Sequence, residues 1–233
     1  MTDRLTVPAA RPAVAADSAP AAVALGTRRV HVALAPIPRR PDLRMLSAAD
    51  RVLLESLPAW RRPEFAGSRA LLRSTLAAVL GADPRGFVLA GGLGQPPAVA
   101  GSPGVRVSIS HGGGYAAAAV SRGADVGVDV ERWRRPHPAL LRRWSTVPAY
   151  RGLSALAPSE QARRFTEAWV VQEACVKALR RGLAARPWLI PVEPSAPAGS
   201  WRGVRWRRLA TGVSGVAAAV AVVVDPAAGS GAP

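Results

Sequence analysis

Three strand-like runs enclosed by two long helical segments are the feature that most constrains the fold. The runs extend from Val105 to Ser110, from Tyr115 to Val120 and from Val126 to Val130. Apolar residues recur at helical spacing over about 63–80 and about 159–181, and side chains three or four positions apart share one helix face. Closely spaced strands combined with separate long helices predict an α+β fold.

The chain divides into a tail and two halves. Residues 1–28 are rich in Ala and Pro without periodicity, which predicts a disordered tail. Residues 29–122 start with a strand at 30–34, and residues 123–233 include a Val/Ala-rich strand near 212–224. Each half offers a strand, a helix and further strands, so we expect two similar α+β halves sharing an interface. The Arg- and Pro-rich stretch 134–160 is expected to be irregular or partly helical.

The charge is strongly positive, at +16, and 30 of the 31 basic residues are Arg. Such a charge favours polyanions, whether nucleic acid, an anionic cofactor or an acidic protein, and does not choose among them. The one lysine is Lys177. Because an ammonium is a compact charge and a guanidinium a broad fork, Lys177 is predicted to do something that Arg cannot.

Other function classes are disfavoured by composition. The single cysteine, Cys175, excludes an intrachain disulfide and a multi-cysteine zinc site. The sequence has no run of about 18 apolar residues, and its N-terminus lacks the basic-then-apolar order of a signal peptide. We therefore expect no membrane association and a cytoplasmic location.

Two carboxylates alternate on the third strand-like run. Asp129 and Glu131 are two positions apart, so they project to the same side, and Val128 and Val130 project to the other. Such a pair suits Mg²⁺, which takes oxygen ligands and completes its coordination with water and substrate phosphates. The alternative is a strand end with two solvated acids.

An acid and a base lie four positions apart on the later helix. Glu173 and Lys177 have the spacing of a surface ion pair, but their helix is largely apolar, which favours a buried and functional pair. Glu173 would add a third carboxylate to a Mg²⁺ site, and Lys177 would meet phosphate oxygens.

Polar residues in the first half are candidates for phosphate contacts. Ser110 and His111 precede three glycines whose backbone amides can hold a phosphate, although a lone loop histidine is often incidental. Arg69 and Arg73 share one helix face, which is either functional or simply solvated. A Ser-His hydrolase is disfavoured because no third partner is placed and no nucleophile elbow is present.

These motifs together resemble the Sfp-type 4′-phosphopantetheinyl transferase family. The resemblance covers about residues 40–185 and is carried by four segments: Arg69-Ala70-Leu71-Leu72-Arg73, Ser108-Ile109-Ser110-His111, Gly127-Val128-Asp129-Val130-Glu131 and Trp169 to Lys177. It implies two pseudo-symmetric α+β halves with the active site at their interface, where coenzyme A would bind. The second half would carry the metal and catalytic residues.

The resemblance also implies roles. Mg²⁺ would be held by Asp129, Glu131 and Glu173. Glu173 would activate a serine of an acidic acyl or peptidyl carrier protein, and Lys177 would offset charge on the departing 3′,5′-ADP. His111 would be the third catalytic residue. The coenzyme A contacts would come from Arg69, Arg73, Gln95, Ser110, His111 and Lys177, with His111 and Arg69 at the 3′-phosphate. A monomer would contain the whole cleft, and the carriers would belong to fatty-acid, polyketide or nonribosomal peptide synthesis.

Two positions depart from the family pattern. Gln172 stands where a Lys usually precedes the helix glutamate, and Gln95 stands where a basic residue is frequent. Each removes a positive charge from a proposed polyanion site. Two alternatives therefore stay open: a catalytically weakened member that binds coenzyme A or carrier protein, and a basic nucleic-acid-binding protein, although no nucleic-acid reading module is recognisable.

Overall fold

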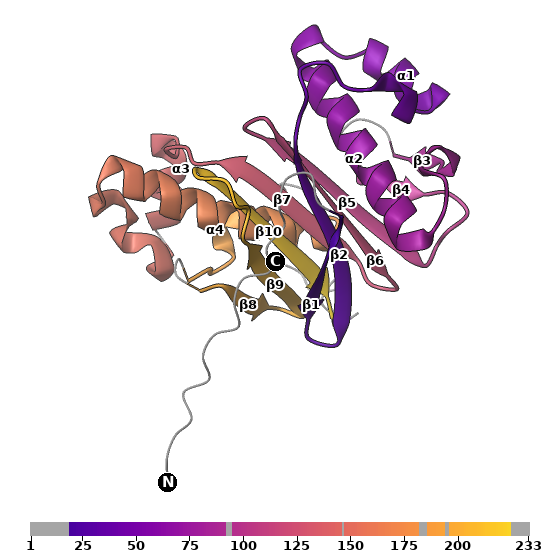
Figure 1. Ribbon diagram of the computed structural model, residues 1–233. Helices are drawn as coiled ribbons and strands as arrows, with labels where there is room; N and C mark the ends of the chain where they lie inside the picture. The colour runs from indigo at the N-terminus through magenta and orange to yellow at the C-terminus, as the bar shows by residue number, and fades with distance from the viewer. Residues whose placement is uncertain (1–18, 92–94, 146, 182–185, 194–195, 225–233) are drawn as a thin grey trace.

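The computed structural model describes residues 19–91, 95–145, 147–181, 186–193 and 196–224. Two four-stranded antiparallel sheets form its centre, in the orders β1-β2-β6-β5 and β7-β10-β9-β8 (Figure 1). The first sheet consists of β1 (Ala21–Leu25), β2 (Arg28–Pro36), β5 (Val105–Gly112) and β6 (Tyr115–Arg122). The second consists of β7 (Val126–Arg132), β8 (Ala198–Trp201), β9 (Val204–Leu209) and β10 (Val216–Val223).

Four α-helices accompany the sheets in the described part of the chain: α1 (Ala48–Glu55), α2 (Arg62–Leu80), α3 (Pro138–Ser145) and α4 (Pro158–Ala178). A short strand pair, β3 (Leu89–Ala90) and β4 (Ala98–Val99), lies in the α2–β5 connection. The mixture of helices and antiparallel sheets confirms the predicted α+β class. Among the described helices, none combines the length and apolar character needed to cross a bilayer.

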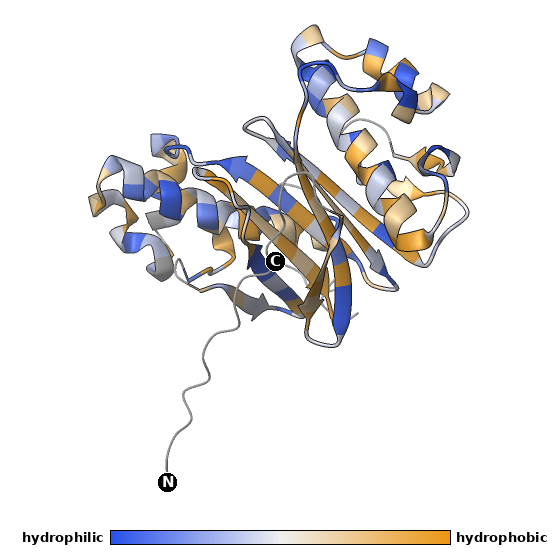
Figure 2. Ribbon diagram, in the orientation of Figure 1, coloured by the Kyte–Doolittle hydropathy of each residue, from blue (hydrophilic) through white to orange (hydrophobic). Residues whose placement is uncertain are grey.

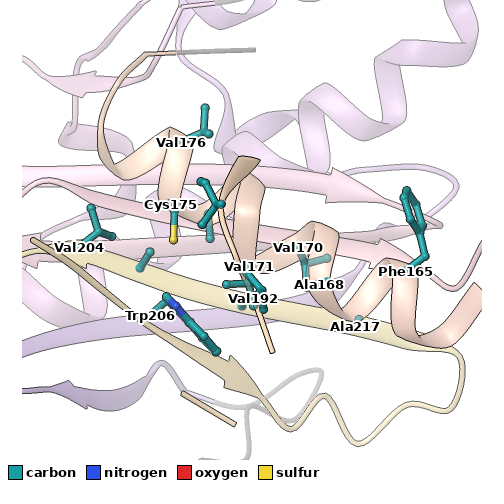
Figure 3. Close-up of a cluster of buried hydrophobic side chains, with 14 of the residues drawn as sticks. Phe165, Ala168, Val170, Val171, Cys175, Val176, Val192, Val204, Trp206 and Ala217 are labelled. Atoms are coloured by element: carbon teal, nitrogen blue, oxygen red, sulfur yellow. The ribbon is translucent and has the colours of Figure 1, made fainter. Parts of the chain in front are cut away.

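The elements stack in four layers, with α2 and α4 on the outer faces of the two sheets. One apolar cluster fills the space between the sheets, and its members include Val32, Val128 and Val220. A second cluster joins α2 to the first sheet. The third joins α4 to the second sheet, and Figure 3 shows Val171 and Cys175 of α4 over this sheet beside Trp206. Figure 2 shows the resulting concentration of apolar residues along the strands between the helices.

Alternation along the central strands explains this layering. In β10, Ala217, Ala219 and Ala221 face α4, while Ala218, Val220 and Val222 face the first sheet. In β6, Ala117 and Ala119 face the second sheet, and Ala118 and Val120 face α2. Strand side chains point alternately to the two faces, so both faces of these strands are buried. Alanine lets the layers approach closely.

The structure confirms several predicted elements and corrects others. The helices expected at 63–80 and 159–181 are α2 and α4, and the region 134–160 is partly helical. The tail prediction is wrong at its end, because β1 pairs with β2 and buries Val23 and Leu25. Residues 1–18 lie outside the described residues. Strands β8 and β9 were not predicted.

Strands β1, β2, β5 and β6 of the first sheet precede residue 123, and β7–β10 of the second sheet follow it; the division of the chain into two halves stays a prediction. Each sheet carries one long helix on its outer face. Pseudo-symmetry of the two halves stays a prediction.

Candidate active site

The candidate site lies where edge strand β5 of the first sheet meets edge strand β7 of the second. Serine side chains connect the two strands here. The backbone N–H of Val128 donates to Ser108 Oγ at 3.1 Å, and Ser110 Oγ donates to Asp129 Oδ1 at 2.6 Å. Ser108 and Ser110 share one face of β5, so their alternation places both hydroxyls against β7.

Gly127 brings α4 directly onto β7. A Cβ added at Gly127 would lie 1.9 Å from the carbonyl oxygen of Ala174 and 2.9 Å from Lys177 Cβ. Only glycine permits this approach without movement of the helix or strand. The absent side chain therefore sets the separation between the two elements that carry the acids and the lysine.

Lys177 connects both sheets to α4. Its Nζ donates to Asp129 Oδ1 at 2.6 Å, to Ser110 Oγ at 2.9 Å and to the carbonyl oxygen of Val128 at 3.2 Å. Three acceptors around one nitrogen match the three N–H donors of an ammonium group, whereas a planar guanidinium would not fit them. The side chain is 30% exposed, so Lys177 is only partly buried.

The three predicted metal ligands influence one another electrostatically. Burial, together with the charges of Asp129 and Glu131 and against the charge of Lys177, raises the pKa of Glu173 to about 7. Burial and the neighbouring Asp129 also raise the pKa of Glu131. The three carboxylates are partly shielded from water and close to one another, and Lys177 does not neutralise all of their negative charge. Under these conditions the pKa values of carboxyl groups rise.

The fit of a divalent cation is supported by two oxygen atoms. Asp129 Oδ2 and Glu173 Oε1 are buried and have no hydrogen-bond partner among the described residues. Buried carboxylate oxygens are normally paired, and oxygen donors of this kind are the preferred ligands of Mg²⁺. Within the described ranges, however, no three His, Cys, Asp or Glu side chains approach closely enough to form a complete metal site. The donor set thus fits a cation that takes further ligands from water or substrate.

His111 lies beside this cluster and faces α2. Its Nδ1 is 3.5 Å from Glu64 Oε2, and its side chain is 32% exposed. Burial lowers the pKa of His111, against the raising effect of Glu64 and together with Lys177 and Arg61. A neutral ring at pH 7 makes the Glu64 contact polar and not ionic. Glu64 is a site neighbour that the sequence did not indicate, because it comes from a separate helix without a local motif.

Arg73 does not reach the site, so its prediction as a coenzyme A ligand is corrected. It is 0% exposed, pairs with Asp50 at 2.7 Å and donates to the carbonyl oxygen of Phe87 at 2.6 Å. Asp50 also completes the capping box of α1 with Ser47. These bonds show that Arg73 and Asp50 join α1, α2 and the following loop.

Arg69 is also buried but retains unused donors. It donates to the carbonyl oxygen of Gly91 at 3.0 Å and lies 3.6 Å from Asp50, a distance too long for a hydrogen bond. Its Nε and Nη1 have no hydrogen-bond partner in the described ranges. Gln95, the other predicted contact from this region, is exposed.

Gln172 faces the core and not the acids. It is 0% exposed, and its Nε2 donates to Tyr150 Oη and to the carbonyl oxygen of Ile190, both at 2.9 Å. Tyr150 in turn accepts from the N–H of Val192 at 2.8 Å. Gln172 therefore anchors the segment that follows α4. A lysine at this position would point into the core, so its replacement by Gln172 does not remove a positive charge from the site.

Comparison with protein families adds an independent observation. Residues 125–208 match the model of the 4′-phosphopantetheinyl transferase superfamily. No curated protein matches the chain. The matched segment contains β7 and α4, and with them Asp129, Glu131, Glu173 and Lys177. The match supports this superfamily and phosphopantetheinyl transfer in general.

Proposed function

We propose that this protein is an Sfp-type 4′-phosphopantetheinyl transferase. It moves the phosphopantetheine arm of coenzyme A to a serine of an apo acyl or peptidyl carrier protein and requires Mg²⁺. The observation that carries the proposal is the cluster of Asp129, Glu131, Glu173 and Lys177, which lies within the matched segment.

The metal assignment rests on the three carboxylates. Asp129, Glu131 and Glu173 would hold Mg²⁺ together with oxygens of coenzyme A and water, because the three side chains do not form a complete site by themselves. The two partnerless oxygens of Asp129 and Glu173 support this assignment. When bound, Mg²⁺ supplies positive charge to the pyrophosphate of coenzyme A and lowers the repulsion among the carboxylates. Phosphoryl transfer depends mainly on positioning and charge neutralisation, so a site of this composition suits it.

Glu173 is proposed as the base. The pKa of Glu173 is about 7 without a cation and falls when Mg²⁺ binds, so its carboxylate is available near neutral pH. It would accept the hydroxyl proton of the carrier serine, directly or through water. The serine oxygen forms a bond to the β-phosphorus of coenzyme A. The bond from that phosphorus to the bridging oxygen breaks, and 3′,5′-ADP leaves with the electron pair.

Lys177 and the first half are proposed to hold the substrate. Lys177 Nζ, already at the junction of the sheets, would exchange one of its three present acceptors for a pyrophosphate oxygen and offset the charge of the leaving group. Ser110 positions Lys177 through its 2.9 Å hydrogen bond. His111, Arg69 and Gln95 are proposed for the 3′-phosphate and adenine end.

The strongly positive net charge is the basis for proposing an acidic carrier protein as the partner. A net charge of +16 favours the acidic surface of carrier proteins by electrostatic complementarity. We further propose a cytoplasmic, monomeric enzyme serving polyketide, nonribosomal peptide or fatty-acid carriers. The core-facing position of Gln172 removes one of the two reasons for expecting a weakened member.

The test is a carrier-loading assay read by mass spectrometry. The protein, coenzyme A and Mg²⁺ are mixed with apo acyl and peptidyl carrier proteins, and the carrier is expected to gain one phosphopantetheine group. Asp129→Asn and Glu173→Gln should abolish the gain, while Asp83→Asn, which removes an exposed carboxylate distant in sequence, should retain it. A folded protein that loads no carrier, or full loading by Glu173→Gln, would overturn the proposal.

A further inference from the structure

A cavity lies at the edges of the two sheets opposite the candidate site. It has a volume of about 410 Å³ and is bounded by the β1–β2 turn at Gly26 and by β8 and β9. In the sheet orders, β1 is three strands from β5, and β8 is three strands from β7. At about 4.8 Å between strands, this places the cavity roughly 14 Å or more from the site described above.

Two arginines of β9 line this cavity on one face. Arg205 and Arg207 are two positions apart and pair in register with Val222 and Val220 of β10, which face the first sheet. Leu209, the next residue on that face, is buried in the apolar cluster between the sheets. Arg205 and Arg207 thus lie on the face of β9 that is turned toward the first sheet, at the margin of the apolar cluster between the sheets.

The positive charge of this cavity is not offset by its walls. No carboxylate is among the lining residues, and neither arginine has an ion-pair partner within the described ranges. Nε of the half-buried Arg207 is inaccessible to solvent and lacks a hydrogen-bond acceptor there. Because Nε itself is covered, a ligand would meet the terminal Nη donors of the two arginines, whose charge no ion pair offsets within the described ranges.

The guanidinium group of Arg205 lies against the β1–β2 turn. A Cβ added at Gly26 would lie 2.7 Å from Nη1 of Arg205, and Gly26 has a positive φ of 66°. The positive φ is what favours glycine in this turn. Arg205 is exposed, and this contact places its guanidinium at the cavity wall next to the turn.

We propose that this cavity binds a phosphate-bearing ligand through Arg205 and Arg207. Two planar guanidinium groups match the oxygens of a dianionic phosphate, which each can bind with paired N–H donors. The volume leaves room for an organic group attached to the phosphate, since ligand cavities begin at about 300 Å³. This site is independent of the proposed transferase function.

Titration with inorganic phosphate at low ionic strength tests the proposal. The NMR amide signals of Gly26 and Gly199 report on this cavity alone, so a signal from the candidate site does not interfere. Arg205→Gln with Arg207→Gln should weaken the phosphate affinity measured there by about ten-fold or more. Arg39→Gln with Arg40→Gln removes the same charge at exposed positions outside the cavity and should leave it nearly unchanged.

Ser200→Glu provides a variant at an exposed position. Ser200 lies opposite Arg205 in the register of β8 and β9, so the new carboxylate should pair with the arginines and compete with phosphate. Retained phosphate affinity in Ser200→Glu and in the cavity double variant would overturn the proposal. Equal weakening by both double variants would also overturn it, because only a diffuse attraction to net charge would then remain.

Discussion

Nζ of Lys177 lies 2.6 Å from Oδ1 of Asp129, across the junction between α4 and β7. The side chain of Lys177 is 30% exposed and that of Asp129 is 7% exposed, so the acid is buried and the lysine partly buried. The pair joins a helix and a strand that are 48 positions apart in the sequence. The contribution of this ion pair to the free energy of unfolding therefore measures how strongly α4 is held against β7 at the candidate site.

Lys177→Met should destabilise the fold by leaving Asp129 without its cation. Breaking a fully buried ion pair costs about 3–5 kcal/mol, and the partial exposure of Lys177 reduces the expected loss to about 1–3 kcal/mol. Urea unfolding measures this change. A double-mutant cycle with Asp129→Asn should give a coupling energy of about 1 kcal/mol or more. Additive single losses would mean that the contact contributes nothing beyond its separate groups.

Gly127→Ala should be more damaging than its small size implies. The new methyl group would overlap the carbonyl oxygen of Ala174, so α4 must move away from β7. We expect a loss of about 3 kcal/mol in the free energy of unfolding, together with lost carrier loading in whatever protein remains folded.

Gly86→Ala is the matched control for Gly127→Ala. No atom lies within 4 Å of the added Cβ at Gly86, and its φ is not positive. Its effect should stay within about 0.5 kcal/mol. Comparable stability of the two variants in thermal or urea unfolding would contradict the close-packing argument.

Local sequence patterns allowed the prediction of the two long helices, of the acidic strand, and of the common face on which its two carboxylates lie. Asp129 and Glu131 are separated by two positions, and strand geometry alone places them together. The pattern failed in β9, where buried Arg208 breaks the alternation; Arg208 lies 3.5 Å from Glu167 of α4, a pairing across the fold. Glu64 escaped prediction for a related reason, because only tertiary packing brings α2 to His111.

Sequence periodicity also could not orient Gln172. It is adjacent to Glu173, yet consecutive helix residues point about 100° apart, so a neighbour in sequence need not face the same site. The burial of Gln172 against Tyr150 depends on the 187–192 segment, which carries no periodic signal of its own.

Gln172→Lys should lower stability and leave coenzyme A affinity without improvement. The ammonium would lose both hydrogen bonds of Gln172 and lie at a position that is 0% exposed, for a cost of about 3 kcal/mol or more. Chemical unfolding and calorimetric titration with coenzyme A measure the two quantities.

Gln95→Lys adds the same positive charge as Gln172→Lys, but at an exposed position. Gln95 is exposed, so stability should change by less than about 0.5 kcal/mol. Under the proposed function, coenzyme A affinity should rise several-fold and the gain should shrink as salt increases. A gain in affinity from Gln172→Lys and none from Gln95→Lys would reverse the assignment of these two positions.

The raised pKa of Glu173 predicts a pH-dependent stability difference between the protein and Glu173→Gln. In the metal-free protein the carboxyl of Glu173 has a pKa of about 7, against an ordinary value of 4.5 for a glutamate. Between these values the folded state binds more protons at Glu173 than the unfolded state, so this contribution to stability is lost as pH rises through about 7. Glutamine resembles the protonated acid at every pH. The variant should therefore match the protein near pH 4.5 and exceed its stability by about 2–3 kcal/mol at pH 8.

Adding Mg²⁺ shows whether the ionised Glu173 is a cation ligand or only a buried acid with a raised pKa. A cation that binds the ionised site should stabilise the protein at pH 8 by mass action, and stabilise Glu173→Gln much less. Because protonation of Glu173 competes with the cation, Mg²⁺ affinity should fall as pH decreases from 8 to 6. Urea unfolding across this pH range, with and without Mg²⁺, gives both quantities. A stability difference that stays constant with pH would contradict the raised pKa, and equal stabilisation of both proteins by Mg²⁺ would place the cation away from Glu173.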